Sequence, residues 1–255
     1  MSRPSSKSNS RPGTRNGRPS TAGGSDSEED DMYSGAPLQV GDEVPNFTCD
    51  SHLGMLTFHE VIDGQFSMLV TFPADFEAVA TTELGAIAKL AEEFEARNVK
   101  IFGLSVDTKH NHRRWIEEVQ ELQECQITFP LLCDVDANVS RVYGLCRPGS
   151  GPSPGAKAVI PATLIVLIDI DKRIRFTAQY PSTTGRNFYE VLRVIDTIQL
   201  SLFHQVGTPS NWMQGEDVFV RNDVSATQAT SMFPKGFVAI REWFRITPQP
   251  DISNK

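Results

Sequence analysis

The stretch Val70–Arg97 constrains the fold most, because a strand with a buried pattern runs there into a short loop and then into a well-patterned helix. Residues Ser67–Phe72 (SMLVTF) are apolar and rich in β-forming side chains, as a central parallel strand requires. After the loop, Thr81 and Thr82 offer hydroxyl caps for a helix, and Glu83 complements its positive end. The helix is predicted from apolar residues that recur at helical spacing: Leu84, Ile87, Ala88, Ala91 and Phe94.

The loop between this strand and this helix is where we expect chemistry, because unpaired N–H groups and the helix dipole favour an anion or a thiolate there. Its sequence, PADFEAVATTELG, resembles the peroxidatic loop of the peroxiredoxins, and of the one-Cys subfamily in particular. The family pattern is PxxxTxxC, followed by a helix start rich in Thr, Ser and Glu. Pro73 matches the Pro of this pattern, whereas Glu77 occupies the Thr position and Ala80 occupies the position of the nucleophilic Cys.

These replacements predict that the chain keeps the peroxidatic loop but cannot carry out the thiol chemistry of the family. Thiol peroxidases need a thiolate that attacks the peroxide and becomes a sulfenic acid, and the methyl group of Ala80 can do neither. The resemblance also aligns Thr163 with the active-site Arg of the family, and no neighbour in 162–165 restores that Arg. Arg186, in TTGRN, matches another family Arg. It either lines a remnant of the pocket or pairs with a carboxylate that flanks a helix.

The order of elements predicts an α/β protein of thioredoxin-like fold, with a mixed central sheet and flanking helices. Asp107 is expected to open a helix that buries Trp115, Val119 and Leu122 on one face. The best helix pattern is Asn187–His204. The further strands are predicted at Val99–Val106, Phe129–Cys133, Thr163–Asp169 and Ile174–Tyr180, the last two as a hairpin.

Three strings near the C-terminus strengthen the resemblance: TPSNW (Thr208–Trp212), MFPKGF (Met232–Phe237) and ITPQP (Ile246–Pro250). They resemble, in order and rough spacing, the extra C-terminal region of the one-Cys peroxiredoxins. In that family this arm reaches over a partner subunit, so the resemblance implies a homodimer. The expected domains are a polar tail at 1–36, a peroxiredoxin domain at 37–205 and a C-terminal dimer arm at 206–255.

The tail 1–36 is rich in Ser, Arg, Pro and Gly and has too few apolar side chains to fold on its own. Its basic residues precede residue 19, and its acidic residues follow Gly24. Two interpretations stay open. The tail is an extension without a special role, or it is a basic arm that docks on an acidic surface such as a cytoskeletal or axonemal assembly, with Ser25 and Ser27 as phosphorylation points. The second interpretation predicts a cytoplasmic protein at the cytoskeleton or cilium.

The four cysteines show neither a CxxC motif nor metal-ligand spacing. Cys133 and Cys146 follow apolar runs and are predicted to be small core residues. Cys49 lies near the opening hairpin without a recognisable base, and Cys125 is predicted to be exposed and unaccompanied. We therefore expect a reducing compartment and no cofactor.

Two histidines at a helix start suggest a metal site as one further hypothesis. His110 and His112 stand two apart at a helix start, where residues without a third ligand are predicted to be solvated and not to bind a metal.

The one-Cys subfamily also has a lipase-like Ser, His and Asp set. Carried over, its His falls on His59 and its Asp on Asp171, but its Ser falls on Gln65. Ser67 is close by but lies inside the predicted strand, so this activity is not expected.

Net charge and composition limit the partners. The net charge of −8 argues against nucleic acid as the main partner, and no apolar run approaches the ~20 residues that a membrane span needs. Three functions remain open. They are a degenerate peroxiredoxin kept as a structural or binding module, a residual thiol peroxidase that uses Cys49 or another thiol, and a partner that dimerises with an active peroxiredoxin and modulates it.

Overall fold

The computed structural model describes residues 38–145, 160 and 162–251. The tail 1–36, Cys146 and the predicted loop Arg147–Ala156 lie outside the described residues. By its internal contacts the chain divides into Met1–Gly35 and Ala36–Lys255, and the second unit holds all of the elements below.

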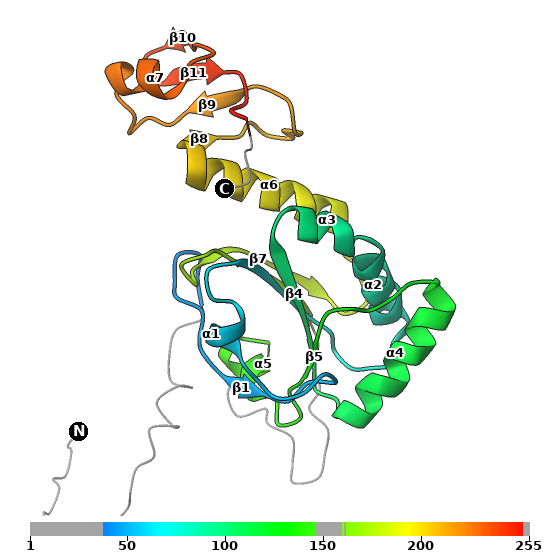
Figure 1. Ribbon diagram of the computed structural model, residues 1–255. Coiled ribbons are helices and arrows are strands. Elements are labelled where there is room, and N and C mark those ends of the chain that lie inside the picture. The colour runs from blue at the N-terminus through cyan, green and yellow to red at the C-terminus, as the bar shows by residue number, and fades with distance from the viewer. Residues whose placement is uncertain (1–37, 146–159, 161, 252–255) are drawn as a thin grey trace, which may run out of the picture. The chain divides into compact units, whose positions relative to one another are not determined.

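A five-stranded mixed sheet forms the centre of this unit, in the order β5-β4-β3-β6-β7 (Figure 1). β3 pairs in parallel with β4, and β4 pairs in parallel with β5, whereas β6 is antiparallel to both β3 and β7. Every residue of β3 is buried. The predicted central strand, the mixed sheet and the hairpin are therefore confirmed. The strands are β3 (Phe66–Thr71), β4 (Val99–Ser105), β5 (Leu131–Cys133), β6 (Ala162–Ile168) and β7 (Ile174–Pro181).

Helices cover both faces of the sheet. One face, with Met68 and Val70 of β3, packs against α2, α4 and α6 in a single apolar cluster. The other face, with Leu69, packs against α1 and α5. This division follows from the alternation of side chains along a strand. The helices are α1 (Phe58–Val61), α2 (Ala78–Lys89), α3 (Ala91–Ala96), α4 (Lys109–Gln123), α5 (Asn138–Val142) and α6 (Phe188–His204).

The predicted start of the helix after the loop is wrong. α2 begins at Ala78 with Glu77 as its N-cap residue, so Thr81 and Thr82 lie inside the helix. Their hydroxyls have other partners, because Thr81 Oγ1 accepts from Trp115 Nε1 at 3.0 Å and Thr82 Oγ1 donates to Val79 O at 2.7 Å. The helix is also divided, since Leu90 between α2 and α3 leaves helical geometry with φ −100° and ψ 8°.

Two details of the next helix also differ from prediction. Thr108, and not Asp107, caps α4, and its side chain accepts from Asn111 N. Leu122 is 69% exposed and does not belong to the buried face, whereas Trp115 and Val119 are buried as predicted. The α6 prediction is confirmed, with Asn187 as its N-cap.

A smaller sheet follows α6, in the order β10-β11-β9-β8. It packs with α7 around a third apolar cluster that contains Trp212 and, from α6, Leu200. Its elements are β8 (Val206–Gly207), β9 (Val218–Val220), α7 (Ala226–Met232), β10 (Val238–Arg241) and β11 (Phe244–Thr247). Near the start of the described chain, β1 (Thr48–Cys49) and β2 (Leu56–Thr57) form a short hairpin. Within the described ranges, no helix is both long and apolar enough to cross a membrane.

Candidate functional site

The loop between β3 and α2 encloses the position that the sequence pattern marks for a nucleophile. Ala80 is the third residue of α2 and is 1% exposed. Glu77 is exposed at the N-cap position and makes no side-chain cap hydrogen bond. Phe76, just before it, has a left-handed φ of 61° and is 43% exposed. The loop therefore exposes the Glu77 carboxylate and the Phe76 ring, whereas the methyl group of Ala80 is buried.

One helical turn after Ala80, Glu83 forms a buried ion pair with Arg186. Arg186 Nε donates to Glu83 Oε1 at 2.8 Å and Nη2 donates to Oε2 at 2.6 Å, so the pairing is bidentate. The guanidinium also donates to Leu164 O at 3.1 Å and to Thr71 O at 3.0 Å. The two side chains are 0% and 3% exposed. Of the two interpretations of Arg186, the structure shows the pairing with a carboxylate.

Thr163, the residue aligned with the family's active-site Arg, is buried at the start of β6. Its hydroxyl has no hydrogen-bond partner in the described part of the chain. The neighbouring Leu164 supplies its carbonyl to Arg186 and its N–H to Thr71 Oγ1 at 2.8 Å. At this position the chain thus offers a hydroxyl in place of a second guanidinium.

A second buried polar group lies at the start of the same loop. His112 Nδ1 is 2.7 Å from Asp75 Oδ2, and both side chains are 0% exposed. Asp75 also accepts from Ser105 Oγ at 2.7 Å, and His112 Nε2 lies 3.0 Å from Leu132 O. Although burial lowers the pKa of His112, its hydrogen bonds to Asp75 and Cys133 raise the pKa to about 10, so the ring is charged at neutral pH.

The prediction that both histidines are solvated is therefore wrong for His112, whereas His110 is exposed. Sequence reasoning missed the Asp75–His112 pair because 37 residues separate its members. The available signal was the place of His112 on the face of α4 that carries Trp115 and Val119. A polar residue on a buried face needs a partner.

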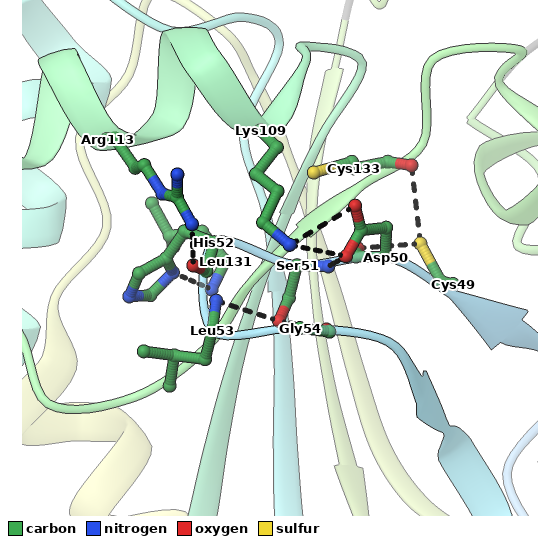
Figure 2. A network of polar contacts seen from close by, with 10 residues as sticks. All are labelled: Cys49, Asp50, Ser51, His52, Leu53, Gly54, Lys109, Arg113, Leu131 and Cys133. Carbon is green, nitrogen blue, oxygen red and sulfur yellow. Dashed lines mark hydrogen bonds and ion pairs between the residues drawn. The ribbon is translucent and has the colours of Figure 1, made fainter.

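The described cysteines differ in their surroundings. Cys49 is buried, and its thiol donates to the carbonyls of Asp50 and Cys133, both at 3.3 Å (Figure 2). Burial and, next, the Asp134 carboxylate raise the pKa of Cys49 to about 12, which keeps it protonated. Cys125 is partly buried and packs against the main core, so its predicted exposure is wrong. Cys133 is partly exposed, which corrects its prediction as a core residue.

The residues of the lipase-like set have structural partners of their own. A ring nitrogen of His59 lies 2.6 Å from Val44 O. Gln65 donates to Asn98 Oδ1, and Ser67 is buried within β3 as predicted. Asp171 is exposed in the turn between β6 and β7. None of these contacts joins two members of the set.

Sequence comparison places these features in a family context. Residues 40–177 match the model described as the AhpC/TSA family. A 1-Cys peroxiredoxin of Dictyostelium discoideum is 37% identical over 214 residues, which are 84% of this chain and 86% of that protein. Peroxiredoxin-6 of Rattus norvegicus is 35% identical over 222 residues, or 84% of this chain and 98% of the relative.

Solved structures agree with this relationship. A yeast mitochondrial 1-Cys peroxiredoxin superimposes with a TM-score of 0.76 at 36% identity, over 83% of this chain and 99% of the other. The Peroxiredoxin 6 of Arenicola marina gives a TM-score of 0.75 at 34% identity, over 84% and 99% of the two chains. The predicted thioredoxin-like fold is therefore confirmed, and the likeness extends beyond the central sheet.

The buried ion pair generates a stability prediction. In Glu83→Gln the guanidinium of Arg186 stays buried without its counter-charge, so the free energy of unfolding should fall by about 3–5 kcal/mol. Urea denaturation followed by tryptophan fluorescence measures the change. The matched control is Glu190→Gln, which removes a surface pairing with Arg193 and should cost at most about 1 kcal/mol. An equal decrease in the free energy of unfolding of the two variants would show that the Glu83–Arg186 pair does not stabilise the loop.

The Asp75–His112 pair predicts a pH dependence of stability. Because the folded pKa of His112 is raised from 6.5 to about 10, its contribution to stability is complete below about pH 6.5 and is lost as the pH rises toward 10. The free energy of unfolding of the wild type should therefore fall more steeply over this range than that of His112→Gln. His110→Gln, at an exposed position of the same helix, should keep the wild-type slope. A wild-type slope in His112→Gln would refute the charged state of this ring.

Proposed function

We propose, since this chain belongs to the AhpC/TSA family and to its one-Cys peroxiredoxin branch, that it is a catalytically degenerate member that acts as a structural or binding module. The observation that carries the proposal is the enclosed methyl group of Ala80 at the pattern position of the nucleophile. On this proposal Pro73, Glu77, Ala80 and Thr163 are the remains of an active site, and Arg186 is its retained cation.

The polar contacts around Ala80 support the same proposal. Arg186 is bound by Glu83, one helical turn after Ala80, and by two backbone carbonyls. A guanidinium with these partners has fewer donors left for a peroxide oxygen. Glu77 adds an exposed negative charge at the mouth of the loop. The surroundings of Ala80 therefore support a structural or binding role more than a role in thiol chemistry.

The alternative of a residual thiol peroxidase finds no support at Cys49. Burial raises the pKa of this thiol to about 12, and peroxide reduction proceeds through the thiolate. A residual activity would need another thiol with a charged neighbour.

The binding role is proposed to use a dimeric body and a basic arm. The body offers apolar side chains on the edge strand β10 and the turn after it, where Val238, Ile240 and Trp243 are 65%, 50% and 65% exposed. Such a patch suits a partner subunit, which is a second copy of this chain or an active peroxiredoxin. The arm is the segment 1–36, and two arms on one dimer would raise the effective concentration at a repetitive, acidic assembly. This arrangement favours a cytoskeletal or ciliary location.

The degenerate site predicts that peroxide chemistry can be restored. Ala80→Cys places a thiol in the first turn of α2, where the helix dipole favours a thiolate. Peroxide consumption with a dithiol reductant should exceed that of the wild type, and it should rise further in the triple variant that adds Glu77→Thr and Thr163→Arg. Val79→Cys, one position away, is the matched control and should stay at the wild-type level. A folded but inactive triple variant would contradict the assignment of this loop.

The proposed tether predicts a role for the basic half of the tail. Microtubule co-sedimentation of the full chain should be lost on deletion of 1–35, and also on replacement of Arg3, Lys7, Arg11, Arg15 and Arg18 by Gln. Because the attraction is electrostatic, binding should weaken with added salt.

The control keeps those five basic residues and replaces the acidic residues of 26–31 by amides, which should preserve or strengthen binding. Equal co-sedimentation of the full and truncated chains would remove the tail from the proposal and leave the folded surface as the binding site.

A further inference from the structure

The helix α4 carries its charges in the order that its own dipole disfavours. Its cationic side chains lie in the N-terminal half and its carboxylates in the C-terminal half: Lys109, Arg113 and Arg114, then Glu117, Glu118 and Glu121. A helix is stabilised by acidic residues in its first turn and basic residues in its last turn, and α4 has neither. A charge order that costs stability indicates a role for these side chains outside the helix.

The two arginines of α4 have no carboxylate as a partner. Both side chains are exposed, and neither forms an ion pair with a residue that the structure describes. Arg113 Nη2 donates a long hydrogen bond to His52 O at 3.4 Å. The guanidinium carbon of Arg114 lies 5.7 Å from the centre of the Phe76 ring. Most of the donors on both guanidiniums are therefore open to a carboxylate that arrives from outside.

Exposed apolar side chains from two separate segments accompany these arginines. Leu53, in the turn between β1 and β2, is 66% exposed, and Phe76, in the loop before α2, is 43% exposed. Leu53 follows the residue whose carbonyl Arg113 binds (Figure 2). Phe76 lies against Arg114. Each arginine thus has an exposed apolar neighbour, which is the combination found in protein interfaces.

Positive charge prevails around this part of α4, although the chain as a whole has a net charge of −8. The Asp50 carboxylate is bound by Lys109 Nζ at 3.0 Å (Figure 2). Burial lowers the pKa of His52, and the positive charges of three α4 residues lower it further: His112, Arg113 and Lys109. The surface is therefore a local cationic exception on an acidic protein, and it attracts an anionic partner over a short range only.

We propose that the α4 surface, formed by Lys109, Arg113, Arg114, Leu53 and Phe76, binds an acidic protein segment that also carries apolar side chains. Carboxylates of the segment pair with the two guanidiniums, whose planar fork suits bidentate contacts, and its apolar side chains cover Leu53 and Phe76. A short segment fits better than a long polyanion such as nucleic acid, which the net charge of the whole chain repels. The surface belongs to the folded body, so the proposal stands whether or not the tail binds.

The test uses the full chain with the basic residues of the tail replaced by Gln, so that the tail does not attract the probe. The probe is a fluorescent synthetic peptide of repeated Glu-Glu-Leu-Phe units, and fluorescence anisotropy measures its binding. Arg113→Gln combined with Arg114→Gln should weaken binding by about fivefold to tenfold, because two ion pairs are lost. Leu53→Ser should also weaken it. Glu77→Gln, which removes the exposed carboxylate next to Phe76, should strengthen it.

The matched control combines Lys89→Gln and Arg241→Gln, which remove two exposed cations outside the α4 surface and should leave the affinity unchanged. Circular dichroism checks that each variant is folded. An equal loss of affinity in the control and in the arginine variant overturns the proposal, as does a folded arginine variant with unchanged affinity. Binding of anionic phospholipid vesicles or duplex DNA through the two arginines, without binding of the peptide, overturns it as well. None of these outcomes affects the proposed degeneracy of the Ala80 loop.

Discussion

The buried ion pair between Glu83 and Arg186 is the interaction on which the rest of this structure depends. It joins α2 to the segment before α6, and the same guanidinium binds carbonyls at the end of β3 and in β6. Burying two charges is costly, and the cost is offset only where each charge has close and complete partners. Here the bidentate geometry and the two carbonyls supply them. The loop between β3 and α2 is thereby held although it retains no nucleophile.

The same pairing explains how the loop keeps its place with Ala80 at the pattern position of the nucleophile. In this chain the cation is fully engaged in fixing α2 against the sheet, and Ala80 fills the space one turn before Glu83. With a methyl group at position 80, the ion pair, the core and the sheet are all in place. A second charged pair, Asp75 and His112, anchors the start of the loop in a similar way. Buried polar contacts therefore preserve the fold of the loop independently of catalysis.

The sequence predicted the elements whose pattern is local. β3, the β6–β7 hairpin and α6 follow from apolar runs and periodicity, and the family resemblance supplied their arrangement. The start of α2 was missed because the hydroxyl of Thr81 serves Trp115 of α4, which no local pattern reveals. His112 was misjudged for the same reason, since its partner lies in another loop. The exposure of Cys133 likewise depends on where β5 leaves the sheet, which the apolar run before it does not indicate.

The central claim is that the loop carrying Ala80 is chemically inert. It is tested most directly by peroxide removal by the full chain, in the presence of excess dithiol, measured beside a one-Cys peroxiredoxin. We predict a rate that equals the rate in buffer alone, because the methyl group of Ala80 cannot form a thiolate and burial raises the pKa of Cys49 and of Cys125. Sustained turnover near that of the active relative would contradict the proposal that this chain is a catalytically degenerate member of the family.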